Sequence, residues 1–389
     1  MLLNKLKKEP PLGWAQLSHQ KVRMIVALSG IAFADILIFM QLGFYNSIFG
    51  GVTRLHEHLN GDLYIVSSRA KFMDDGQTFA RRHLYQANAV AGVSSASPFY
   101  YSHAGWVNPW NKKVTNVAIL AFDPAQPVLN LPDVNRQLNQ IKLPDKVLVD
   151  RRARPDLGAI AQAFDRGKTV TTEISGRRIS VGGMFDFGST LFVEGYLITS
   201  DWNYLRLYGA ESIENLKVGV LNIDPGKAPE KIKAKVKASL PNIVSVMTHD
   251  EFIAAEKEFW DKNHPAGTIF NFGVVMGFVV GVVIVYQVLF ADVNDHLAEY
   301  ATLKAMGYRD RSLLIIVFQE AIILAVLGFI PGFGFSIGMY SLLEALTQMP
   351  LAMGTDVALR VFFLTIFMCL ASGAIAIRKL QSADPAEVF

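Results

Sequence analysis

The chain has 389 residues, of which 51% are hydrophobic and only 18% charged, and its formal net charge is +3. A mean hydropathy of +0.28 over this length indicates membrane-spanning segments combined with a water-soluble part, while the small charge gives no support for a nucleic-acid binder. The only cysteine, Cys369, lies in an apolar run, so no intrachain disulfide is expected and a soluble domain would depend on its own hydrophobic core.

The first membrane helix is predicted at residues 24–44, an apolar run of about the ~20 residues that a bilayer requires. Residues 1–23 carry several lysines and Trp14, a composition typical of an interfacial N-terminal helix. The run has no small-residue cleavage site, which favours a retained anchor over a signal peptide. Apolar residues continue at helical spacing over 45–60, so this helix is expected to extend beyond the membrane as a stalk.

Residues 45–267 are predicted to form a large mixed α+β domain, because short β-type runs alternate with helix-like pieces and turn residues. The pattern Thr248 to Glu251 is a capping box that starts a helix ending near Asn263. This second stalk segment, 248–264, is expected to pack against 45–60. The predicted strands are 62–66, 117–122, 169–174, 191–197 and 218–221.

Three further membrane helices are predicted at 268–290, 312–346 and 357–377, with a kink at Pro331 in the second of these. Lysine and arginine flank the first span, occupy the 291–311 connector and follow the last span, but are absent from the loop 347–356. The positive-inside rule therefore places both termini, including the tail 378–389, and the connector in the cytoplasm. The large domain is then expected outside, which in a bacterium is the periplasm.

The 291–311 connector is predicted to contain a short amphipathic helix. Its apolar stripe would be covered either by lipid headgroups or by a partner protein, and Gly307 fits a helix C-terminus. The stripe is formed by Leu297, Tyr300 and Leu303, and the charged face by Asp292, Asp295, Glu299 and Lys304.

Residues 299–307, EYATLKAMG, resemble the signature of the MacB/FtsX family of ABC permeases, and the C-terminal residues 384–389, DPAEVF, resemble its terminal Asp-Pro segment. The overall layout is most similar to the DevC-type branch of that family, from cyanobacterial exporters. One departure is His296, which stands where many relatives carry arginine.

The resemblance implies a membrane α-helical fold with four transmembrane helices, MacB/FtsX-like, and a large α+β periplasmic domain between the first and second. It also implies that the connector is the coupling helix, which docks on a separate ATPase, so the chain is no enzyme itself and needs no cofactor or metal. The implied coupling residues are Leu297, Glu299, Tyr300, Leu303, Lys304, Met306 and Gly307.

The partners implied by the resemblance are a DevA-like ABC ATPase subunit that binds ATP, a DevB-like periplasmic adaptor, a TolC-like outer-membrane channel and a second copy of the chain. The substrate would be a lipid or amphiphile such as a glycolipid, exported from the inner membrane of a cyanobacterium. The four predicted spans carry no continuous polar face, so they leave little room for a wide pore through the membrane. This favours a substrate that is loaded from the periplasm or the outer leaflet. Two alternatives remain, an FtsX-like relay that regulates a periplasmic hydrolase and a membrane-anchored enzyme.

Two acids, Asp35 and Glu320, fall inside predicted spans, where a charge is costly, so each should face protein or water. They either act during a transport cycle or are hydrogen-bonded packing residues. Small residues at four-residue spacing on the second span form a ridge that suits close helix packing, within the chain or in a dimer. The ridge consists of Gly273, Gly277 and Gly281.

Three other patterns receive plain interpretations. The triplet 167–169, Gly-Lys-Thr, lacks the first glycine of a phosphate loop, since Gln162 stands there, and is expected to be an ordinary loop. Residues 56–58, His-Glu-His, would point to different faces of a helix, which predicts a solvated stalk surface. Trp106 and Trp110 either pack in the core or mark a contact loop, and no catalytic constellation is recognised.

Overall fold

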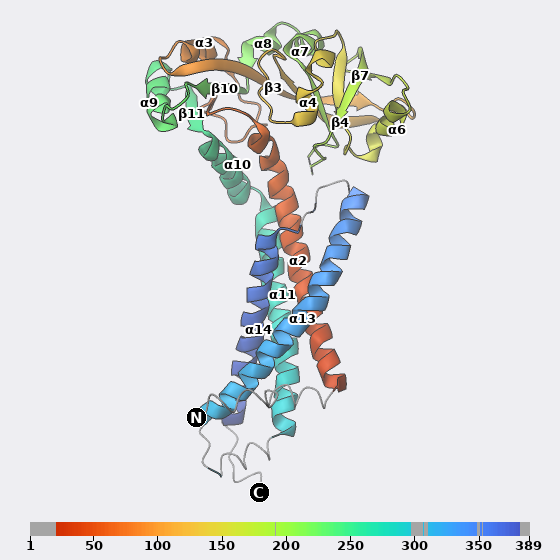
Figure 1. Cartoon of the computed structure of the whole chain (residues 1–389), viewed down its shortest axis with the longest axis vertical. Helices are drawn as coiled ribbons and strands as arrows, with labels where there is room; N and C mark the ends of the chain where they lie inside the picture. Colours follow the sequence, from red (N-terminus) through yellow and green to blue (C-terminus); the bar gives the residue numbers. More distant parts are fainter. Residues whose placement is uncertain are drawn as a thin grey trace. The chain divides into compact units, whose positions relative to one another are not determined.

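The computed structural model describes residues 21–190, 192–296, 306, 310–347, 351 and 353–381 (Figure 1). The chain divides into two compact units. The first, called here the helical unit, comprises residues 1–45, 266–342 and 351–389, and the second, called the sheet unit, comprises 46–265 and 343–350.

Among the described residues, four helices are long and apolar enough to cross a membrane, as the sequence predicted. They are α2 (Lys21–His58), α11 (Pro265–Asp295), α13 (Asp310–Thr347) and α14 (Thr355–Gln381). Helix α2 runs without interruption from the helical unit into the sheet unit.

The helical unit has an apolar core to which all four helices contribute. Ala27 and Ile31 of α2 pack in one cluster with residues of α11, α13 and α14, including Leu289 and Leu324. The ring of Phe39 of α2 packs against two phenylalanine rings of α13, with centroid distances of 5.9 and 6.0 Å. Such close packing of side chains is what holds helices together where water exclusion contributes little.

The sheet unit is built around a nine-stranded mixed sheet with the order β11-β1-β10-β3-β4-β8-β5-β7-β6, and a separate ribbon of β2 and β9. Only the pairs β4–β8 and β5–β7 are parallel. The strands are β1 (Leu63–Ser67), β2 (Phe79–Ala80), β3 (Val93–Val107), β4 (Val114–Phe122), β5 (Lys146–Asp150), β6 (Thr171–Ile174), β7 (Arg177–Phe185), β8 (Tyr196–Ser200), β9 (Asn215–Leu216), β10 (Val218–Ile223) and β11 (Val244–Thr248).

Helices cover the sheet, so alternate residues of one strand enter two different cores. In β1, Leu63 and Ile65 pack in one core, and Tyr64 and Val66 pack in the other. The helices are α3 (Arg82–Asn88), α4 (Pro132–Asn135), α5 (Leu138–Ile141), α6 (Ile160–Asp165), α7 (Asp201–Tyr208), α8 (Glu211–Glu214), α9 (Pro229–Ser239) and α10 (His249–Asn263), with a 3₁₀ turn η1 at Pro155–Leu157.

Strand β3 joins the two halves of the sheet. Its residues 93–99 pair with β10 and its residues 100–107 pair with β4. At the end of β3, Trp106 also pairs with Ile174 of β6. The last strand of the sheet order, β6, therefore lies next to β3, from which the second half of the sheet starts. The 15-residue length of β3 allows one strand to serve both halves.

The capping box predicted at Thr248 is confirmed: its side chain accepts from the Glu251 N–H, and the Glu251 carboxylate accepts from the Thr248 N–H. It starts α10, whose Phe252 packs in the same core as Leu55 and Leu59 at the end of α2. The ring of Phe252 lies 4.4 Å from that of His56. Within the sheet unit, the end of α2 and α10 therefore bury their apolar faces together.

The prediction of a strand at 191–197 was wrong at its beginning, since β8 starts at Tyr196. The run 192–195 instead forms bends, and Phe192 points out of the sheet to reach Trp260 of α10, at a centroid distance of 4.7 Å. Strands β2, β3, β5, β7, β9 and β11 were not predicted.

Trp106 and Trp110, whose roles the sequence did not decide, have different environments. Trp106 is completely buried, and its Nε1 donates to the Leu157 carbonyl at 3.0 Å, whereas Trp110 is 53% exposed. Trp106 is thus a core residue.

We expect Trp106→Ala to destabilise the sheet unit by about 3–5 kcal/mol, because it removes a large buried ring and leaves a cavity. The check is thermal unfolding of the full chain in detergent. Trp110→Ala is the matched control and should change stability little; equal losses in the two variants would contradict the assignment of Trp106 to the core.

Candidate functional site

Most of the predicted coupling residues lie outside the described residues. Met306 is the exception, and its side chain is 64% exposed. Leu297, Glu299, Tyr300, Leu303, Lys304 and Gly307 are not among the described residues. Their role therefore stays a prediction.

Asp292 was predicted on the charged face of a short amphipathic helix, and this prediction was wrong. Helix α11 continues through the start of the connector to Asp295, so Asp292 belongs to a membrane helix and is only 3% exposed. Arg23 of α2 explains how an acid can be buried there: its guanidinium lies 3.5 Å from Asp292 and 2.5 Å from Asp295. The imidazole of His296 lies 3.7 Å from Asp292.

Glu320 of α13 is fully buried and faces Asp292. Neither of its carboxyl oxygens has a donor among the described residues. The helical unit thus contains two buried acids, Asp292 of α11 and Glu320 of α13, and Arg23 of α2 lies beside the first of them. Two facing carboxyl groups can hydrogen-bond to each other only if one of them holds a proton.

Asp35 lies on α2 and is also fully buried. Thr365 of α14 donates to its Oδ1 at 2.6 Å, and its Cβ packs closely against Gly332 of α13. The acid thus faces protein, although Oδ2 has no partner within the described part of the chain. Asp35 and Glu320 occupy separate surroundings, and the structure does not bring them together.

The glycine ridge of α11 lies against other helices of the same chain. A Cβ added at Gly277 would come within 2.9 Å of Ile38, and one at Gly281 would overlap the Met368 sulfur. At Gly273 the nearest group is the side chain of Gln41. Among the described residues, this ridge therefore packs within the chain.

We expect Gly281→Leu to destabilise the helical unit by about 1–3 kcal/mol, because the added carbons would overlap α2 and α14. Gly338→Leu on α13 is the control, since no atom lies within 4 Å of the point that a Cβ would occupy there. Thermal unfolding in detergent compares them; a Gly281 variant as stable as the control would argue against the intrachain contact.

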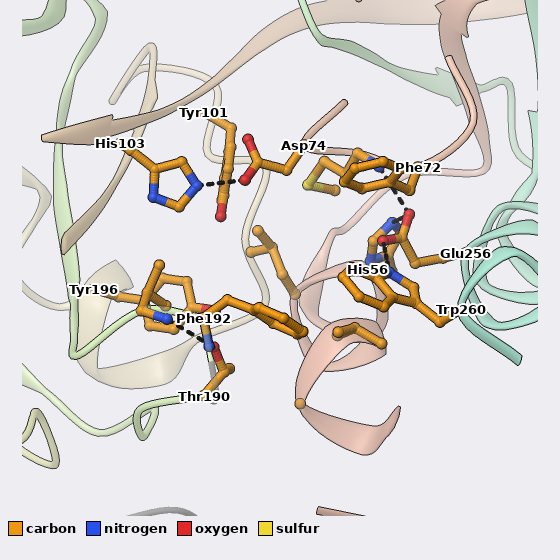
Figure 2. Close-up of a pocket in the computed structure, with 15 residues that line it drawn as sticks. His56, Phe72, Asp74, Tyr101, His103, Thr190, Phe192, Tyr196, Glu256 and Trp260 are labelled. Atoms are coloured by element: carbon orange, nitrogen blue, oxygen red, sulfur yellow. Dashed lines mark hydrogen bonds and ion pairs between the residues drawn. The ribbon is translucent and has the colours of Figure 1, made fainter. Parts of the chain in front are cut away.

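No pattern in the sequence indicated a cavity of about 330 Å³ that lies in the sheet unit (Figure 2). Its wall is formed by the end of α2, the loop 68–78, strand β3, helix α10, Thr190 and residues of the segment 192–196. Five aromatic side chains line it, namely Phe72, Tyr101, Phe192, Tyr196 and Trp260.

Two histidine–carboxylate pairs stand in the wall of this cavity. His56 Nε2 lies 3.2 Å from Glu256, whose carboxylate also accepts from Trp260 Nε1 and the Met73 N–H, each at 2.9 Å. His103 Nε2 bonds Asp74.

Asp74 also accepts from Lys217 Nζ at 2.9 Å. Burial acts to raise the pKa of Asp74, but the hydrogen bonds from His103 and Lys217 outweigh it and hold that pKa below its ordinary value. Asp74 is therefore a stable negative charge in the cavity wall at neutral pH.

The solvated surface predicted for residues 56–58 was wrong for His56, which is only 1% exposed, and right for Glu57. His56 is buried because α10 packs on α2, and its partner Glu256 lies 200 positions further along the chain. The available signal was the apolar stripe shared by these two helices.

Part of the helical unit matches a known protein family. Residues 271–385 match the family model described as FtsX-like permease C-terminal. No curated protein matches the chain.

Several solved structures are similar to about half of the chain. The periplasmic region of MacB from Actinobacillus actinomycetemcomitans has 12% identity and a TM-score of 0.34, covering 50% of this chain and 91% of that one. The extracellular domain of the noncanonic ABC-type transporter YknZ from Gram-positive bacteria has 10% identity and a TM-score of 0.32, covering 48% and 99%. A permease domain from Porphyromonas gingivalis has 13% identity and a TM-score of 0.31, covering 49% and 89%.

The FtsX-like domain and the four apolar helices together support one class, a multi-pass membrane subunit of an ABC-type permease. The matched segment contains residues 299–307, which carry the sequence signature that resembles the MacB/FtsX family.

Proposed function

We propose that this chain is the transmembrane subunit of a DevC-type ABC exporter, which converts motion of a separate, DevA-like ATPase into work on the outer side of the membrane. The observation that carries the proposal is the FtsX-like match over 271–385, which spans the last three apolar helices and the connector between α11 and α13. The ATP is bound by the partner, and the chain itself performs no hydrolysis.

In this proposal the connector 291–311 and both termini are cytoplasmic, and the sheet unit is periplasmic, as the distribution of lysine and arginine favours. The continuity of α2 and the extension of α11 to Asp295 support mechanical transmission, because a push on the connector acts directly on a long helix. The ion pairs of Arg23 with Asp292 and Asp295 join this end of α11 to α2.

The chain would work as a homodimer with a DevB-like adaptor and a TolC-like channel, in a cyanobacterial inner membrane, and would export an amphiphile such as a glycolipid. The dimer would need a surface other than the glycine ridge, since that ridge is covered within the chain. The cavity in the sheet unit favours export over a purely mechanical relay, since a relay has no need of a space for a ligand.

The test is affinity capture of the full chain from detergent-solubilised membranes. Recovery of an ABC ATPase together with a coiled-coil adaptor supports the proposal. Recovery of the ATPase with a cell-wall hydrolase in place of the adaptor would instead establish the relay, and recovery of no ATPase would refute both.

A further inference from the structure

The aromatic cavity of the sheet unit, about 330 Å³ in volume, has acidic side chains in its described lining but no lysine or arginine. The acidic side chains are Asp74 and Glu256. Lys217 is not part of the described lining, but it donates to Asp74 and compensates one of the two negative charges, and its Nζ lies 5.1 Å from the centroid of the Tyr101 ring. Glu256 has no lysine or arginine partner among the described residues, and its hydrogen-bond donors are Trp260 Nε1 and the Met73 N–H.

Hydrogen-bonding groups in the wall are also incompletely paired. His103 Nε2 hydrogen-bonds Asp74, whereas His56 Nε2 lies 3.2 Å from Glu256 without forming a hydrogen bond. Neither ring nitrogen of His56, nor Nδ1 of His103, has a hydrogen-bond partner among the described residues. His56 is almost completely buried, so its unpaired nitrogens are not satisfied by bulk water.

The aromatic rings that line the cavity are the third feature that favours a cation. Phe72 and Phe192 each pack against Trp260, with ring centroids 5.5 and 4.7 Å apart, and Tyr101 and Tyr196 stand on the opposite side of the space (Figure 2). The face of an aromatic ring is negative and attracts cations, more strongly where water is excluded. Phe192 is 38% exposed, so this ring can be reached from solvent.

We propose that this cavity binds a protonated amine attached to an apolar body. The ammonium charge would pair with the Glu256 carboxylate, its N–H groups would donate to imidazole nitrogens that have no partner, and the apolar body would pack on the aromatic rings. An anion would meet two carboxylates with no lysine or arginine in the described lining, and a neutral hydrocarbon would leave the imidazole nitrogens unpaired. The inference deepens the proposed export function by defining the cargo as a cationic amphiphile.

The test uses three probes of matched size on the full chain in nonionic detergent, without ATP or any partner, measured by calorimetry against a micelle-only blank. The probes are benzyldimethylammonium, its neutral isostere isobutylbenzene, and phenylmethanesulfonate. We expect the ammonium compound to bind at least tenfold more tightly than the isostere, and the sulfonate not to bind. Equal binding of the three, or no binding of the ammonium compound, would overturn the proposal.

Two variants and one control locate the site. Glu256→Gln should weaken ammonium binding about tenfold, and Phe192→Ala, at an exposed ring whose loss spares the core, about fivefold, the size of one cation–π contact. Asp165→Asn, at an exposed ion pair with Arg151, should leave binding unchanged. Unchanged binding in Phe192→Ala and Glu256→Gln together would place the ligand elsewhere. Because no ATPase is present, failure here leaves the coupling proposal intact.

Discussion

Replacing Glu299 by alanine, or Gly307 by proline, should reduce the ATP hydrolysis that this subunit stimulates in its ATPase partner to the partner's basal rate. Glu299 is the acid of the family signature, and its loss removes a charged contact from the docking helix. Gly307 follows the predicted helix, where a left-handed conformation is needed that proline cannot adopt. Both changes lie in a short connector between membrane helices, so insertion into the membrane should be unaffected.

Hydrolysis is measured with the reconstituted pair, and the amount of inserted subunit is measured in the same membranes. Asp356→Asn is the control, because Asp356 is an exposed acid at the start of α14, away from the connector in sequence. Stimulated hydrolysis that persists at full rate in both connector variants would rule out docking at this segment.

Replacing Arg23 by alanine should destabilise the helical unit by about 3 kcal/mol, the lower end of the range for breaking a buried ion pair, because Arg23 retains some exposure to solvent. The buried carboxylate of Asp292 would be left without its arginine and would still face Glu320. In the Arg23→Ala background, Glu320→Gln should recover part of the loss, since it removes an acid that has no donor among the described residues.

Thermal unfolding in detergent of the two single variants and the double variant gives the coupling energy directly. Arg360→Ala is the matched control, since Arg360 forms an ion pair with Asp356 in which both side chains are largely exposed, and it should change stability by less than about 1 kcal/mol. If Arg23→Ala is no worse than this control, or if Glu320→Gln adds to its loss, then Arg23 does not stabilise the acid pair.

The parts of the fold that depend on local pattern were predicted from the sequence. The four apolar helices required only length and composition, and the start of α10 required only the spacing of Thr248 and Glu251. Strands such as β1 and β4 were recognised because burial on both faces makes them continuous apolar runs.

The features that were not predicted depend on contacts between residues that are far apart in the sequence. Strand β3 contains Ser, Pro and His at positions that are typical of a loop, and it is a strand because β10 and β4 supply hydrogen bonds to it. Asp292 is buried only because Arg23, far away in the sequence, comes from another helix.

The cavity of the sheet unit was invisible for the same reason. Its wall takes His56, His103 and Trp260 from segments that are separated by tens to hundreds of residues. No local motif brings these residues together, so the candidate ligand site emerged only from the tertiary structure.

The measurement that tests the central claim most directly is the side of the membrane on which residue 300 lies. Tyr300→Cys and, as a control in the sheet unit, Trp110→Cys are made in a Cys369→Ala background, which removes the chain's own cysteine. An impermeant maleimide should label the Trp110→Cys protein in intact cells and the Tyr300→Cys protein only after the inner membrane is permeabilised. Labelling of position 300 from outside in intact cells would contradict the account, because an ATPase in the cytoplasm could not reach the connector.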